Sequence, residues 1–120
     1  MKSEFNLVTE TKDNCIVINT TGYINNIGGQ KIVDEFYKHN GNGINNVILN
    51  LAKSNVVNSI GISFLIEIIE KLNQTNGKLI FSNLDPSIEK TLTIMGLFQF
   101  AKKAENLEEA LKLLSYKPYQ

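Results

Sequence analysis

The stretch Asn46-Val-Ile-Leu-Asn-Leu-Ala-Lys-Ser-Asn-Val-Val-Asn-Ser-Ile-Gly-Ile-Ser-Phe-Leu-Ile-Glu-Ile-Ile-Glu70 joins an apolar run, a polar loop and an apolar repeat. The run Val47–Leu51 is almost wholly apolar, which is typical of a strand covered on both faces. From Ser59 to about Gln74 the apolar residues recur at helical spacing, so a helix is predicted to begin at Ser59. The segment therefore predicts a buried strand followed by a helix, with a hydroxyl side chain where the helix starts.

The remaining segments extend this order into an α/β fold. The same patterns predict strands over residues 5–11, 15–21 and 78–82, an extended piece near 98–101, and helices over 27–38, 86–95 and from 107 onward. Crossovers of the strand–helix–strand kind give parallel pairs. We expect one domain over residues 1–115, with a mixed, mostly parallel sheet of four to five strands covered by about four helices. Residues 116–120 are expected to be a frayed tail.

Several short signals mark the ends of the predicted helices. The glycines of Asn40-Gly-Asn-Gly43 are expected to stop the first helix, since glycine supplies the left-handed conformation of a C-cap. Asp85 followed by Pro86 is a strong helix start. Asn106, with Glu109 three residues later, has the spacing of a capping box.

Composition excludes several classes of function. The 120 residues carry twelve basic and twelve acidic side chains, so the formal net charge is zero and no basic cluster indicates nucleic acid binding. Neither a signal-peptide core nor an apolar run of the ~20 residues of a membrane helix is present. We therefore expect a cytoplasmic protein that binds neither nucleic acid nor membrane. Cys15 is the only cysteine, which excludes an internal disulfide and favours a small buried side chain.

The residues of catalytic chemistry are also missing from the sequence. His39 stands alone near the end of a predicted helix, where a favourable dipole position explains it. We find no phosphate-binding loop, no paired carboxylates, no nucleophile–base–acid set and no metal-ligand spacing. The interpretation is a protein without catalytic residues, metal or cofactor, and not an enzyme.

The helix after Ser59 has one flank that two hypotheses explain differently. The stripe that anchors it to the sheet consists of Ile62, Leu65, Ile66, Ile69 and Leu72. Beside this stripe lie Ile60, Phe64 and Ile68. Either the first helix covers all three as core, or Ile60 and Phe64 stay partly exposed at the centre of a docking surface, where an aromatic anchor is often a hot spot.

Ser59 likewise allows two interpretations. As an N-cap, its hydroxyl would accept a backbone N–H, which is worth about 1 kcal/mol. As a phosphorylation site it is equally well placed, because a phosphate at a helix N-terminus meets unpaired N–H groups and the positive end of the dipole. A phosphate carries a charge of about −1.5 to −2, which this fold would tolerate but an apolar partner would not.

The segment Asn50–Gly61 resembles STAS domains, the family of bacterial anti-sigma factor antagonists. Three later segments are similar to the family's later strand, its Gly-Leu turn and its final helix: 76–84, 95–98 and 107–111. The similarity covers nearly the whole chain.

The resemblance implies a switch. Unphosphorylated antagonists bind a kinase-type anti-sigma factor, the kinase phosphorylates the antagonist, and a PP2C-type phosphatase restores it. Family members carry Asp-Ser-Ser-Gly or Asp-Ser-Thr-Gly where this chain has Asn58-Ser-Ile-Gly61, so Ser59 is the hydroxyl that remains. The family's Gly-x-Leu-Asp loop corresponds to Gly22-Tyr-Ile-Asn25 here. The resemblance thus implies a partner-binding site formed by Tyr23, Asn25, Asn58, Ser59, Ile60, Gly61 and Phe64.

Two further functions stay open at this point. The chain could be a non-phosphorylated, stressosome-like scaffold subunit, or a STAS domain that senses a small ligand. For the first hypothesis we expect a monomer or weak homo-oligomer that binds an anti-sigma factor or serine kinase, whereas a scaffold subunit assembles into a larger complex.

Overall fold

The computed structural model describes residues 4–115, which form one five-stranded sheet with four α-helices. The elements are β1 (Asn6–Lys12), β2 (Cys15–Thr21), α1 (Asn26–Asn40), β3 (Asn46–Lys53), α2 (Ser59–Asn73), β4 (Lys78–Ser82), α3 (Pro86–Ile94), the 3-10 helix η1 (Leu97–Gln99), β5 (Lys102–Ala104) and α4 (Leu107–Ser115). The strand order is β1-β2-β3-β4-β5; β1 is antiparallel to β2, and the other neighbours are parallel. The predicted mixed, mostly parallel α/β fold is confirmed. The expected tail, 116–120, lies outside the described residues.

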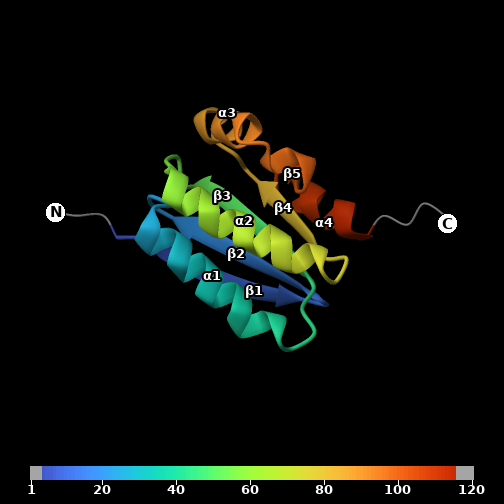
Figure 1. Cartoon of the computed structure of the whole chain (residues 1–120). Helices are drawn as coiled ribbons and strands as arrows, with labels where there is room; N and C mark the ends of the chain where they lie inside the picture. The colour runs from blue at the N-terminus through green and yellow to red at the C-terminus, as the bar shows by residue number, and fades with distance from the viewer. Residues whose placement is uncertain (1–3, 116–120) are drawn as a thin grey trace.

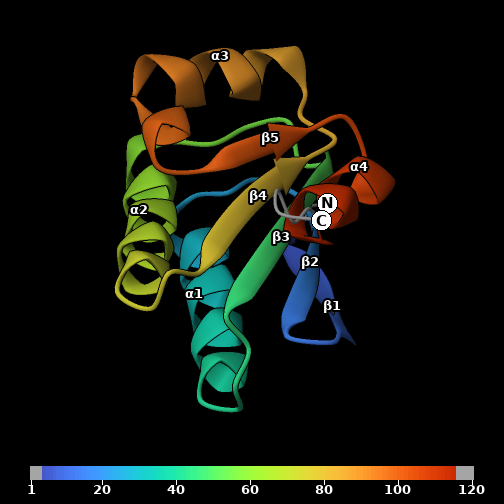
Figure 2. The ribbon, with the colours of Figure 1, turned by 90° about the vertical axis from the view of Figure 1, so that its right-hand side faces the viewer.

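The helices form layers on both faces of the sheet (Figure 1). Helices α1 and α2 lie side by side on one face, α4 lies on the other, and α3 lies beyond the end of β4 (Figure 2). Along β3, Val47, Leu49 and Leu51 belong to the core shared with α1 and α2. Ile48 points the other way, into a smaller core beneath α4 that also contains Cys15. Burial on both faces explains why this strand is almost wholly apolar.

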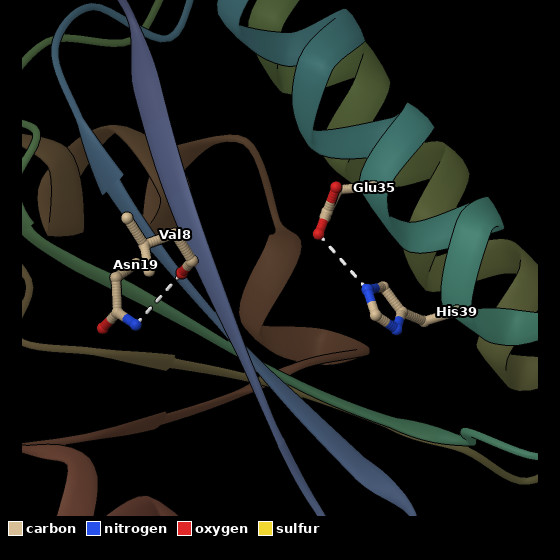
Figure 3. Close-up of polar contacts among 4 residues, drawn as sticks. All are labelled: Val8, Asn19, Glu35 and His39. Carbon is tan, nitrogen blue, oxygen red and sulfur yellow. Dashed lines mark hydrogen bonds and ion pairs between the residues drawn. The ribbon is translucent and has the colours of Figure 1, made fainter.

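The face opposite α1 is polar where α4 does not reach. The Asn19 side-chain amide donates to the carbonyl oxygen of Val8 at 3.2 Å, as Figure 3 shows, and it accepts from the Asn50 amide at 2.8 Å. On α1, the His39 Nε2 atom lies 3.2 Å from a carboxylate oxygen of Glu35, a contact drawn in the same figure. His39 thus has a local partner one helical turn away.

The helix α1 ends at Asn40, as the stretch Asn40–Gly43 predicted, but the left-handed glycine expected at its C-cap is not there. Gly41, the C-cap, has a right-handed φ of −70°, and the left-handed turn comes two residues later, at Gly43 with φ +84°. The strand expected near 98–101 is instead β5, at Lys102–Ala104. Leu97 and Ala101 are both buried and four residues apart, so this segment packs as a helical turn rather than by the alternation of a strand.

Candidate docking site at the N-terminal ends of α1 and α2

The helix α2 begins with Asn58 as its N-cap, not with Ser59. The Asn58 side-chain oxygen accepts the backbone N–H of Gly61 at 2.8 Å. Ser59 is the first helical residue, is exposed, and its hydroxyl makes no hydrogen bond within residues 4–115. Of the two interpretations of Ser59, the N-cap is wrong, because Asn is at least as good a cap and Asn58 stands one position earlier. The Ser59 hydroxyl therefore faces solvent at the start of α2.

The loop before α1 is held against the loop before α2 by backbone hydrogen bonds. The N–H of Ile24 donates to the oxygen of Val56 at 3.0 Å, and the N–H of Asn58 donates to the oxygen of Ile24 at 3.2 Å. A Cβ at Gly61 would lie 2.1 Å from that same Ile24 oxygen. Glycine at position 61 therefore allows the start of α2 to approach the Ile24 backbone.

A buried pair of hydroxyls lies below these loops. Thr20 and Ser54 are both buried, and their side-chain oxygens are 2.7 Å apart. The pair sits where the register between β2 and β3 shifts, between Asn19 and Thr21. Each hydroxyl satisfies the other where neither meets water. This pair joins the end of β2 to the loop that leads to Ser59.

The start of α1 uses Asn25 as its own N-cap. The Asn25 side-chain oxygen accepts the N–H groups of Ile27 and Gly28, each at 3.0 Å. Both helices thus begin with a capping asparagine, and both begin at the same end of the molecule (Figure 1). Tyr23, two residues before Asn25, is exposed. Of the two loop residues in the predicted site, Tyr23 is the exposed one, whereas the amide oxygen of Asn25 is occupied.

The flank of α2 formed by Ile60, Phe64 and Ile68 is buried in part and exposed in part, so each of the two hypotheses holds for part of it. Ile68 is fully buried, and Phe64 is half-buried against α1, where a Cβ at Gly29 would lie 2.5 Å from its ring. Ile60, by contrast, is 51% exposed. The first helix therefore covers the middle of the flank and leaves its N-terminal end open. Phe64, which lies between Ile60 and Ile68 on this flank, is intermediate in burial as well.

Five exposed side chains gather around the two helix starts, and we call them the N-terminal face: Tyr23, Ile27, Val56, Ser59 and Ile60. None of the five is charged. The sequence interpretation missed Ile27 and Val56. A signal for Ile27 was available, since it falls outside the buried helical stripe of α1, whereas Val56 lies in a loop without periodicity.

A small cavity adjoins this face between the loop before α2 and the start of α3. It has a volume of about 270 Å³ and includes Val56, Ser87 and Thr91 in its lining. Asp85 caps α3 through the Ser87 N–H and hydroxyl, and these hydrogen bonds hold the pKa of Asp85 below its ordinary value. Ligand sites usually exceed roughly 300 Å³, so this cavity gives little support to the small-ligand hypothesis.

The described residues contain neither a metal-ligand cluster nor a helix that could span a membrane. Within residues 4–115, no three His, Cys, Asp or Glu side chains are grouped so that they could hold a metal ion. No helix in that range is both long and apolar enough to cross a bilayer.

Comparison with known proteins identifies the family. The STAS domain model matches residues 6–110. The chain belongs to the STAS domain family. The fold of this STAS domain is also that of an anti-sigma factor antagonist from Mycobacterium paratuberculosis, with a TM-score of 0.82 at 17% identity, covering 94% of this chain and 96% of that one.

Two further solved structures share the fold of this STAS domain. The Bacillus cell fate determinant SpoIIAA in its phosphorylated form matches with a TM-score of 0.72 at 19% identity, covering 91% of this chain and 99% of that one. RsbS from Moorella thermoacetica, in a variant with serine replaced by glutamate, matches with a TM-score of 0.73 at 22% identity, covering 90% and 93%.

Proposed function

We propose that this STAS domain is a cytoplasmic regulatory protein that docks a kinase-type anti-sigma factor, or a similar protein, through its N-terminal face. The observation that carries the proposal is the exposed Ser59 hydroxyl, which has no hydrogen-bond partner within residues 4–115 and is followed in the helix by the exposed apolar side chain of Ile60. On this proposal the protein is bound rather than catalytic.

The physical properties of the N-terminal face favour binding to a protein. Tyr23 and Ile60 present large uncharged side chains, and aromatic anchors are enriched among binding hot spots. The loops beneath them are held by the Ile24, Val56 and Asn58 backbone hydrogen bonds. A face that is already ordered loses less conformational entropy when a partner docks.

Phosphorylation of Ser59 would switch this docking off. As the first residue of α2, Ser59 lies where backbone N–H groups and the helix dipole stabilise an anion. Ile60 and Val56 beside it would lie against the partner, and burying a charge of about −2 there is costly. The likeness to SpoIIAA, a structure in the phosphorylated form, is consistent with such a switch. A PP2C-type phosphatase would reverse it.

A second candidate function is an unmodified scaffold subunit of a stressosome-like assembly. It is favoured by Ile60, a bulky apolar residue at the position where many relatives have a second hydroxyl, and by Asn58 in place of the usual aspartate. Native mass measurement separates the two functions. A stable large assembly that contains unphosphorylated chain supports the scaffold.

Titration calorimetry with the kinase-type anti-sigma factors of the source bacterium tests the docking proposal. We expect the Ile60→Asp variant to bind at least ~10-fold more weakly than the unchanged protein, the order of effect of a hot-spot residue. Val8→Asp is the matched control, because Val8 is exposed at a comparable level on β1, away from this face. Equal losses in both variants, or none in Ile60→Asp, would exclude the N-terminal face.

Incubation of the same pair with ATP, followed by mass spectrometry, tests the switch. We expect one phosphate on Ser59 and none on Ser59→Ala. Phosphate on another residue, or none at all, would remove Ser59 from the mechanism and leave docking untouched.

A further inference from the structure

The strand β1 forms one edge of the sheet and pairs with a neighbour on one side only (Figure 2). Phe5 belongs to the core shared with α1 and α2, and Leu7 packs against that core. The alternate residues of β1, which point to the other face of the sheet, are all exposed: Asn6, Val8, Glu10 and Lys12. Val8, in the middle of this row, is 65% exposed. An edge strand offers its unpaired N–H and C=O groups to any further strand.

The two edges of the sheet differ in how well they are protected against pairing with another chain. The opposite edge, β5, has only three residues, and two of them are Lys102 and Lys103. Short edge strands and edge lysines are devices by which proteins prevent such pairing. By contrast, β1 has seven residues and no proline, and its register with β2 runs from Asn6 to Lys12 without a bulge. The edge of β1 is therefore open to a further strand.

Glu4 and Lys12 place opposite charges at the two ends of this edge. Both side chains are exposed, and neither lies in an ion pair within residues 4–115. Glu4 stands two residues before β1 and continues alongside the end of β2, since a Cβ at Gly22 would lie 3.4 Å from its carbonyl oxygen. A second copy running in the opposite direction would bring its base to this acid and its acid to this base.

We propose that the edge of β1 binds a second copy of this chain, as an antiparallel pair of β1 strands about a two-fold axis at Val8. In this register Val8 of one copy faces Val8 of the other. Asn6 then lies opposite Glu10, and two residues further along Glu4 lies opposite Lys12. Each of these two pairs occurs twice, because a two-fold interface repeats every contact. Backbone hydrogen bonds between the edges join two five-stranded sheets into one.

The charges select this register from its neighbours. Side chains opposite each other in a strand pair lie on the same face, so the axis must pass through a residue of β1. An axis at Leu7 would set Glu4 against Glu10, and an axis at Glu10 would set that glutamate against itself. An axis at Thr9 sets no acid opposite a base over the described residues. Of these four registers, the one centred on Val8 alone pairs an acid with a base.

The small size of the contact limits the strength of this dimer. One strand against another buries less than the ~800 Å² per partner of a standard interface. We therefore expect a dissociation constant on the order of 10–100 µM. None of the five residues of the N-terminal face belongs to β1. Different variants therefore test docking and dimerisation, and the inference stands or falls independently of the proposed function.

Sedimentation velocity over about 5 to 500 µM protein tests the dimer, because this range brackets the expected constant. We expect the sedimentation coefficient of the unchanged protein to rise with concentration toward that of a dimer. Val8→Asp sets two like charges against each other at the axis and should remain monomeric throughout. Ile60→Asp is the matched control and should dimerise as before. A monomer at every concentration, a dimer that Val8→Asp leaves intact, or one that Ile60→Asp weakens as much would overturn the proposal.

A charge exchange tests the register. Glu4→Lys and Lys12→Glu should each raise the dissociation constant about 5- to 20-fold, because each sets like charges against each other at two symmetric positions. The double variant restores opposite charges and should return the constant to within about 2-fold of the original. Glu10→Lys is the matched control, since Glu10 faces Asn6 in this register, and it should change the constant by less than about 3-fold.

Circular dichroism and thermal unfolding establish that each of these variants is folded, which their exposed positions permit. A double variant that dimerises no more tightly than the singles would overturn the register centred on Val8. So would a Glu10→Lys protein that dimerises much more tightly than the unchanged chain, since that gain would mean that Glu10 faces another glutamate.

Discussion

Gly61 lies so close to Ile24 that any side chain at position 61 would put its Cβ 2.1 Å from the Ile24 carbonyl oxygen. The contact joins the first turn of α2 to the loop before α1. Because the obstacle is backbone rather than a flexible side chain, relief requires the helix start or the loop to move. The N-terminal face therefore depends on the absence of a side chain at this position.

We expect Gly61→Ala to lower the free energy of unfolding by about 1–3 kcal/mol, the range of overpacking substitutions. Gly41→Ala is the matched control. Nothing lies within 4 Å of a Cβ at Gly41, and its φ of −70° suits alanine, so a gain of up to about 1 kcal/mol is expected. Urea denaturation measures both. A Gly61→Ala protein as stable as the control would show that the two backbones separate without cost.

Removing the N-cap of α2 should cost more than removing the neighbouring hydroxyl. Asn58→Ala leaves the Gly61 N–H without its acceptor, and we expect a loss of about 1 kcal/mol. Ser59→Ala removes an exposed hydroxyl with no intramolecular partner in residues 4–115, so its effect should stay within about 0.5 kcal/mol. Thermal unfolding compares the two. A larger loss of stability in Ser59→Ala than in Asn58→Ala would indicate that Ser59, not Asn58, caps the helix.

The buried hydroxyl pair below the loops should show coupling in a double-mutant cycle. Thr20→Val leaves the Ser54 hydroxyl buried without a partner, and Ser54→Ala does the same to Thr20, so each should cost about 1–3 kcal/mol. The double variant leaves no orphaned hydroxyl and should lose less than the sum, by about 1 kcal/mol. Additive losses would mean that the 2.7 Å contact contributes nothing specific.

The thiol of Cys15 should make the free energy of unfolding fall as the pH rises above about 9. Burial raises the pKa of Cys15 from 9.0 to about 11. Between these values the thiol of the unfolded chain ionises while the folded thiol keeps its proton, so rising pH favours unfolding. The effect is absent below pH 9 and reaches about 2–3 kcal/mol near pH 11.

The measurement compares the unchanged protein with Cys15→Ala, which cannot titrate at this position. Their difference in free energy of unfolding should shrink as the pH rises from 8 to 11, because only the unchanged protein loses stability through this thiol. A difference that stays constant over that range would contradict the raised pKa.

Local sequence patterns predicted an element correctly where the residues that cause its structure all lie in one short segment. The apolar run Val47–Leu51 predicted a strand covered on both faces, and Asp85 before Pro86 predicted the start of α3; both are confirmed. The shift of the last strand to Lys102 was not predicted. A segment of four residues is too short for its periodicity to distinguish a helical turn from a strand. The distinction depends on which of its side chains are buried in the core.

The candidate site depended on information that no local pattern contains. Asn58 and Ser59 are adjacent and both are good caps, so only the position of the first helical residue assigns the role. Thr20 and Ser54 are 34 residues apart, and their contact exists only because β2 and β3 are neighbours in the sheet.

The order of strands and helices along the chain and its zero formal net charge could be obtained without a structure, because periodicity and composition are properties of the residues themselves. The packing of the elements explains why Ile60 and Phe100 are exposed to water while Ile68 and Leu97 are buried. Exposure of an apolar side chain depends on which neighbouring element covers it. For these four residues, the exposure is set by how α1, α2 and η1 pack against the sheet.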